Sequence, residues 1–175
     1  LVAMVFVFVG FGFKISAVPF HFWTPDVYEG APTPVTGFVS VASKAASFAL
    51  LMRFFVAVFP STLIIDGQAM QDFWIQLVIA ASVISMVLGN TLALAQRNIK
   101  RLLAYSSIAQ AGYTLIGVAA IQAAPVTEAG SLLGPANGVG AVAFYTLTYT
   151  FTNLLAFADV ALFSAPTGSE TIADL

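Results

Sequence analysis

Three stretches of this chain run for the thickness of a bilayer without one charged residue, and they constrain the fold most. They cover residues 73–96, 102–127 and 129–158. A helix needs about 20 apolar residues to cross the hydrocarbon core, and helices satisfy their own backbone polar groups in lipid whereas open strand edges do not. The chain is therefore predicted to be an all-α, polytopic transmembrane helix bundle.

Composition supports this class of protein. The chain is 59% hydrophobic and 8% charged, with a mean hydropathy of +0.95, whereas soluble domains carry roughly 25% charged residues. The formal net charge of −2 argues against nucleic acid as a partner and leaves the lipid bilayer as the expected surroundings.

Two further apolar segments, residues 1–18 and 33–59, contain one lysine each, Lys14 and Lys44, in almost uncharged surroundings. An ammonium at the centre of a bilayer costs at least ~2.5–3.5 kcal/mol on insertion scales. We therefore expect both lysines to face a protein interior or a water-filled path. The alternative is that each side chain extends along its own stem to a membrane interface, which explains Lys44 less well because it lies near the middle of its segment.

Together these segments predict one membrane domain over residues 1–175 with about five helices. The expected spans are residues 1–30, 33–59, 73–96, 102–124 and 137–165. The first span cannot be one regular helix, because it and the connection after it contain four prolines in sixteen residues: Pro19, Pro25, Pro32 and Pro34. We expect the break near Pro19, since proline removes a backbone hydrogen bond and broken helices line cavities in transporters. A proline-rich interfacial loop, with Trp23 and Tyr28 in the aromatic belt, is the alternative.

The basic connection at Arg97, Lys100 and Arg101 predicts the orientation, because positively charged loops stay in the cytoplasm. Alternation of the five helices then puts the segment around Asp26 and the C-terminal residues on the same, inner side. The connections that contain Asp66 with Asp72, and Glu128, are expected outside. Arg53 falls toward the outer end of its helix and is expected to be an interfacial anchor.

Polar residues recur at helical spacing in three of the expected helices. They are Ser40, Lys44 and Ser47; then Ser106, Gln110, Tyr113 and Gly117; then Tyr145, Thr148, Thr152, Ala156 and Asp159. Small and hydroxylated residues in membrane helices serve close packing, and that interpretation stays open for each stripe. The functional alternative is a hydrated path for protons, for which Ser106, Gln110 and Tyr113 are the candidates. Asp159 is either part of such a path or solvated near the inner interface.

Motifs for soluble chemistry are absent from the sequence. The chain has no cysteine and one histidine, so neither a thiolate metal site nor a histidine-ligated one is expected. It has no phosphate-binding or dinucleotide-binding glycine motif. We expect no complete active site and no cofactor bound to this chain itself.

Three blocks carry a resemblance to a known family. They read FKISAVPFHFWTPDVYEGAPTPV, then Ser43-Lys44, then NIKRLLAYSSIAQAGY over residues 98–113. In this order, with thirty residues from Lys14 to Lys44, they resemble the N-type antiporter-like subunit of bacterial and plastid complex I, the proton-pumping NADH:quinone oxidoreductase. The block WTPDVYEGAPTPV is what separates this type from its paralogues and from Mrp-type sodium/proton antiporters.

The resemblance implies a fold and a set of site residues. It implies a fourteen-helix fold with two inverted five-helix repeats, of which this chain is an internal fragment covering helices seven to eleven. It implies that Lys14 pairs with a glutamate outside the fragment and that Lys44 is the next lysine of a central proton path. His21 matches a position near that path, and a structural histidine is the alternative. Many relatives have histidine where this chain has Gln110, and no family role is implied for Asp159.

The function implied is proton translocation coupled to electron transfer from NADH to quinone elsewhere in the complex. On this interpretation NADH, FMN, iron–sulfur clusters and quinone are bound by other subunits, and the partners are the other membrane subunits. The chain would then be an enzyme only as part of the translocase, in the cell inner membrane, or in the thylakoid membrane if plastid or cyanobacterial. An Mrp-type sodium/proton antiporter subunit and a structural membrane scaffold are the alternatives.

Overall fold

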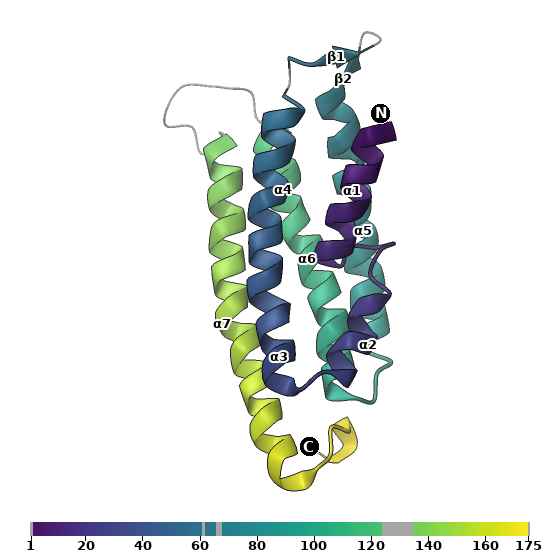
Figure 1. Cartoon of the computed structure of the whole chain (residues 1–175), viewed down its shortest axis with the longest axis vertical. Coiled ribbons are helices and arrows are strands. Elements are labelled where there is room, and N and C mark those ends of the chain that lie inside the picture. The colour runs from purple at the N-terminus through teal and green to yellow at the C-terminus, as the bar shows by residue number, and fades with distance from the viewer. Residues whose placement is uncertain (1, 61, 66–67, 124–134, 175) are drawn as a thin grey trace.

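A bundle of long helices forms the protein in a computed structural model, which describes residues 2–60, 62–65, 68–123 and 135–174 (Figure 1). The elements in chain order are α1 (Val2–Ile15), α2 (Trp23–Gly30), α3 (Thr33–Phe38), the π-helix η1 (Val39–Ser43), α4 (Lys44–Val58), β1 (Ile64–Ile65), β2 (Gln68–Ala69), α5 (Met70–Ala93), α6 (Ile99–Ala123), α7 (Pro135–Thr167) and the 3₁₀ turn η2 (Ile172–Asp174). Four of the described helical spans are long and apolar enough to cross a membrane: Thr33–Val58, Met70–Ala93, Ile99–Ile121 and Gly138–Thr167. The predicted all-α membrane fold is confirmed, and α1 is a shorter apolar helix.

The first expected helix is broken between α1 and α2, as predicted near Pro19. The backbone N–H of Ala17 donates to the carbonyl of Gly12 (2.8 Å), and that of Ser16, at φ 64°, donates to the carbonyl of Phe13 (3.2 Å). This pair of bonds is the Schellman arrangement, which satisfies the last carbonyls of a helix. The indole Nε1 of Trp23 also donates to the Phe13 carbonyl (2.9 Å). The break therefore leaves few unsatisfied backbone groups, because backbone polar groups inside a bilayer have to be hydrogen-bonded within the protein.

The second expected helix is continuous but contains a π-helical turn. Residues Val39–Ser43 form η1 between α3 and α4, so Lys44 is the first residue after the π turn. Single π turns inside α-helices occur frequently at functional sites. The hydroxyl of Ser40 donates to the Gly37 carbonyl (2.7 Å) and accepts from the side-chain amide of Asn153 on α7 (2.5 Å). Helix α7 therefore holds the π turn from its side.

Helices α5 and α6 pack backbone to backbone. A Cβ added to Gly89 would lie 2.6 Å from the backbone nitrogen of Ala109, and one added to Gly112 would lie 2.8 Å from the carbonyl oxygen of Ser82. Glycine permits this approach because it has no Cβ, and small residues at such contacts are typical of membrane helices. The Ser82 hydroxyl donates to the Gly112 carbonyl across the contact (2.7 Å).

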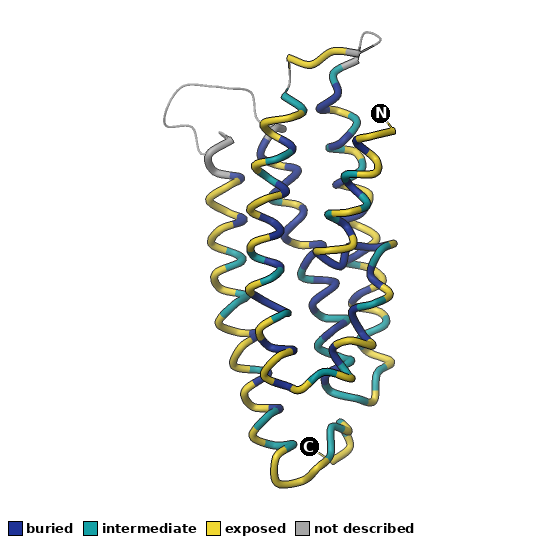
Figure 2. The backbone as a smooth tube through the Cα atoms, in the orientation of Figure 1, coloured by how far each residue is buried: buried dark blue, intermediate teal, exposed yellow. Residues whose placement is uncertain are grey.

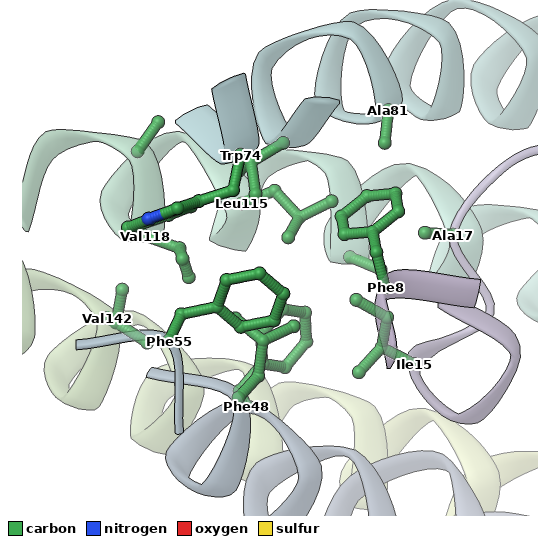
Figure 3. Close-up of a cluster of buried hydrophobic side chains, with 14 of the residues drawn as sticks. Phe8, Ile15, Ala17, Phe48, Phe55, Trp74, Ala81, Leu115, Val118 and Val142 are labelled. Carbon is green, nitrogen blue, oxygen red and sulfur yellow. The ribbon is translucent and has the colours of Figure 1, made fainter. Parts of the chain in front are cut away.

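The larger described apolar core lies between α1, α4, α5 and α6, with Val142 from α7, and Figure 3 shows Phe8, Phe55 and Trp74 among its side chains. Figure 2 shows that buried residues follow the inner faces of these helices while the outer faces of α4 and α7 are exposed. Outward Phe and Leu side chains, such as Phe144 (73% exposed) and Leu162 (74%), are what a lipid-facing or subunit-facing surface carries.

The two ends of the bundle differ. Strands β1 and β2 lie at one end, and α2, the α5–α6 connection and the C-terminus lie at the other (Figure 1). The segments around Asp26 and Arg101, which the orientation prediction put on one side, are together at this second end. The connections that contain Asp66 and Glu128 lie outside the described residues.

Candidate functional site: the Lys44 cradle

Lys44 is buried in the bundle, with a relative exposure of 5%. Its ammonium Nζ donates to the backbone carbonyl of Ser107 (3.2 Å) and to the Ser107 hydroxyl. It also lies 5.9 Å from the ring centroid of Tyr28, within the range of a cation–π contact. We call Lys44, Ser107 and Tyr28 the Lys44 cradle.

Three elements build the cradle, because Lys44 begins α4, Ser107 lies on α6 and Tyr28 lies on α2. Tyr28 is fully buried and meets the ring of Phe157 on α7 edge-on, with centroids 6.1 Å apart. Its hydroxyl lies 3.4 Å from the Ser107 hydroxyl. The second part of the broken first span, α2, therefore places the Tyr28 ring over the ammonium of Lys44 in the next span.

A small cavity adjoins the Lys44 ammonium between α4, α6 and α7. Its volume is ≈ 10 Å³, counted as the space open to the centre of a water molecule. This is about enough for one water. Thr146 and Tyr149 line it; the Thr146 hydroxyl has no hydrogen-bond partner within the part of the chain that the structure describes, and the Tyr149 hydroxyl interacts with that of Ser107. Buried hydroxyls normally have a partner, so the Thr146 hydroxyl is the group that a water in this cavity would bond.

Gln110 connects this cavity to a larger groove. Its side-chain oxygen accepts a hydrogen bond from the hydroxyl of Tyr145. Tyr145 and Tyr113 then line an open, mainly apolar groove of ≈ 610 Å³ between α6 and α7. The Tyr113 hydroxyl accepts a hydrogen bond from the side-chain amide of Asn90 on α5 (2.9 Å).

The residues that surround Lys44 are only partly those that the polar stripes indicated. Ser106 is half-buried and makes no bond to Lys44, whereas its neighbour Ser107 supplies both acceptors. On α7, Thr146 and Tyr149 face the cavity, and Thr148 and Asp159 are exposed. Sequence reasoning missed Ser107, Tyr28, Thr146 and Tyr149. The available signal was the alternative spacing 146, 149 and 153, one position away from the chosen face.

Lys14 and His21 lie outside the cradle. Lys14 is exposed in the last turn of α1, and no carboxylate of the described residues forms an ion pair with it. His21 is 6% exposed, and its Nδ1 has no hydrogen-bond partner among the described residues. Arg53, the expected interfacial anchor, is also exposed. No group of three metal-ligating side chains gathers in the described ranges.

Ion pairs hold α2 against the start of α6 at the end of the bundle. The Arg101 guanidinium lies 2.7 Å from the Asp26 carboxylate and 2.8 Å from that of Glu29. Beside it the buried Lys100 ammonium pairs with Glu170 (2.7 Å) and donates to the carbonyl of Ala31 (3.0 Å). This ionic end fixes the helix that carries Tyr28.

Comparison with known proteins places this geometry in a family. A family model described as NADH:quinone oxidoreductase/Mrp antiporter, TM, matches residues 1–175. The chain is 51% identical to NADH-quinone oxidoreductase subunit N of Moorella thermoacetica and 49% identical to NAD(P)H-quinone oxidoreductase subunit 2 of Thermosynechococcus vestitus, over 99% of its length in each case. It spans 32% and 30% of the lengths of these relatives.

Solved structures agree. The fold matches a chain of respiratory complex I from Thermus thermophilus with bound aureothin at a TM-score of 0.63 and 40% identity, covering 87% of this chain and 28% of that one. An archaeal membrane-bound sulfane sulfur reductase matches at a TM-score of 0.76 and 23% identity, over 94% of this chain and 30% of that one, and shows the fold alone. The predicted resemblance to the N-type subunit is confirmed by the relatives. The chain belongs to the NADH:quinone oxidoreductase/Mrp antiporter transmembrane family.

Proposed function

We propose that this chain is part of a proton-translocating membrane subunit of NADH:quinone oxidoreductase and that Lys44 carries protons. The observation that supports this most is the Lys44 cradle, in which a buried ammonium meets a carbonyl, a hydroxyl and an aromatic ring. No carboxylate of the described residues pairs with it. An ammonium without a counter-ion in a low dielectric is costly, so the neutral amine is an accessible state and the group is able to release and regain a proton.

The route to and from Lys44 follows the polar groups around it. Lys14 is the proposed donor side, and its exposed position on α1 leaves it open to a carboxylate supplied by another helix of the full protein. The cavity beside Lys44 and the Gln110–Tyr145 hydrogen bond form the proposed continuation. Gln110 exchanges no proton itself and orients water. Ser106, Tyr113 and His21 remain predictions for this path.

The names of the relatives support the proposed enzyme complex and the proposed partner subunits. They are subunits of quinone oxidoreductases, so this chain acts as part of a translocase with other membrane subunits. NADH, FMN, iron–sulfur clusters and quinone would be bound elsewhere in the complex. The protein lies in the cell inner membrane, or in thylakoids in a cyanobacterial or plastid setting. The same names favour this assignment over a separate Mrp-type antiporter.

Charge-preserving substitution separates a proton carrier from a structural lysine. Arginine keeps its charge because its pKa exceeds 12, so in the assembled complex Lys44→Arg and Lys44→Ala should both lower quinone-dependent proton pumping. Pumping is measured in membranes and normalised to the assembled complex on a native gel. A scaffold role predicts that arginine substitutes well and that alanine acts through assembly. Full pumping by an assembled Lys44→Arg variant rejects the carrier role.

Cysteine labelling tests the proposed orientation. The chain has no native cysteine, so one introduced at Asn98, beside the basic connection, is the only one in it. It should react with an impermeant reagent only from the cytoplasmic side, whereas one at Thr62 should react only from the opposite side. The reverse pattern would overturn the orientation.

A further inference from the structure

We propose that Tyr28 and Ser107 are positioning residues that hold Lys44 in both of its protonation states, by reversing the direction of one hydrogen-bonded chain of hydroxyls. The inference rests on the proposed function, since it concerns a lysine that gains and loses a proton. It goes beyond that function by naming what keeps the amine in place while its charge changes.

The geometry is a chain of three groups, and the phenol of Tyr149 is a further neighbour of the Ser107 hydroxyl. Lys44 Nζ bonds the Ser107 hydroxyl, and the Ser107 and Tyr28 hydroxyls lie 3.4 Å apart, so that either is able to donate. The Ser107 backbone carbonyl accepts a second bond from the same amine (3.2 Å). Ser107 is 1% exposed and Tyr28 is fully buried, so bulk water does not substitute for either hydroxyl.

A hydroxyl suits both states because it has one hydrogen and two lone pairs. When Lys44 is charged, its ammonium only donates, so Ser107 accepts from it and turns its own hydrogen toward the Tyr28 oxygen. When Lys44 is neutral, the nitrogen gains a lone pair and accepts from Ser107, whose oxygen then accepts from Tyr28. The change needs only rotation about the C–O bonds, and no proton passes along the chain.

Among the residues that the structure describes, no other charged side chain faces Lys44. The titratable groups that face Lys44 are the phenols of Tyr28 on α2 and Tyr149 on α7; from α6 come Ser107, Gln110 and Thr114, which do not titrate. The ion pairs of Arg101 with Asp26 and Glu29 lie at the end of the bundle. The hydroxyl chain is therefore the part of the cradle that adapts to the charge on Lys44.

The test is the pH profile of pumping in the assembled complex. Ser107→Ala removes the hydroxyl and keeps the carbonyl. Hydrogen bonds to a charged group are stronger than those between neutral groups, so the charged amine loses more than the neutral one. We expect the profile to move by about one unit to lower pH. Tyr28→Phe keeps the ring over the amine and removes only the outer hydroxyl, and a smaller shift in the same direction is expected.

Ser82→Ala is the matched control. Ser82 is also a buried serine (2% exposed) whose hydroxyl bonds α6, at the Gly112 carbonyl, but it does not line the cavity beside Lys44. Its loss should affect assembly as much as that of Ser107 and leave the pH profile in place. If Ser107→Ala does not assemble, Tyr28→Phe decides alone.

Unshifted profiles in assembled Ser107→Ala and Tyr28→Phe complexes reject the inference, as does an equal shift in Ser82→Ala. Lys44→Arg, measured in parallel, separates this failure from that of the proposed function. If an assembled Lys44→Arg complex does not pump while the hydroxyl variants keep the native profile, the carrier role is retained and only the hydroxyl chain is rejected. If assembled Lys44→Arg pumps fully, the proposed function itself is rejected.

Discussion

The two membrane lysines of this chain occupy opposite kinds of surroundings. Lys44 is 5% exposed and its ammonium is bound by two acceptors from α6 and covered by a ring from α2. Lys14 is exposed at the end of α1, without an ion pair among the described residues. One lysine is enclosed by this chain, whereas the other faces outward.

The difference shows how the positive charge of each lysine is compensated within a membrane. Lys44 is bound by neutral hydrogen-bond acceptors, and on the proposed function both of its protonation states are used. Lys14 lies in the last turn of α1, where the helix dipole favours a positive charge, and on the proposed function its remaining compensation comes from another part of the full protein. Variants at the two positions should therefore fail in different ways.

Charge reversal should separate the lysines most strongly. Lys44→Glu puts a buried carboxylate against the Ser107 carbonyl, an uncompensated charge that costs roughly 3–5 kcal/mol. We expect the assembled complex to be lost on a native gel. Lys14→Glu leaves the packing of this chain intact, so the complex should assemble while its pumping falls. Equal assembly of the two variants would show that Lys44 is not enclosed in the native complex.

Packing behind the cradle should give the next largest effect. A side chain at Gly89 would overlap the backbone of Ala109 and push α6, with Ser107, relative to α4. Overpacking of this kind costs about 1–3 kcal/mol. Gly89→Ala should lower the temperature at which half of the complex dissociates, and Gly30→Ala, where a Cβ would meet nothing within 4 Å, should not. An unchanged temperature for Gly89→Ala would mean that α5 and α6 are held less closely.

The ionic end should matter least. Arg101→Ala removes both ion pairs that hold α2, and exposed pairs of this kind contribute up to about 1 kcal/mol each. We expect a small loss of thermal stability at low salt that fades as salt is raised, because salt screens exposed charges. Arg97→Ala, an exposed arginine without a described ion pair, is the control. A loss that persists at high salt would point to packing by the Arg101 stem instead.

Much of the fold was predictable from the sequence because the bilayer imposes it. Uncharged runs of spanning length predict helices, and the prolines predict a break near Pro19. The capping of that break was not predictable, because it depends on Ser16 adopting φ 64° and on Trp23 returning to the Phe13 carbonyl. Contacts of this kind depend on where the chain goes after the break, which local spacing does not encode.

The candidate site was predictable at its centre and less so around it. Lys44 stands out because a lone charge in an apolar segment needs compensation. Its partners do not stand out, because Ser106 and Ser107 are adjacent identical residues and only the rotation of α6 decides which one faces the amine. Glycine contacts with α5 set that rotation, and they are tertiary contacts. On α7, likewise, Thr146, Tyr149 and Asn153 face inward. Each lies one residue after a position of the predicted polar stripe.

The π turn before Lys44 has a consequence for how this helix tolerates change in length. A π turn closes hydrogen bonds from residue i to i+5, so residues 39–43 accommodate one residue more than α-helical winding would. Removing one residue there would restore regular winding and leave the residues before η1 nearly in phase with Lys44, whereas winding all five residues as α-helix would rotate them by about 100°. The π turn thus absorbs one inserted residue, and a homologous helix without that residue and without the π turn would present the same faces on both sides of a one-residue gap.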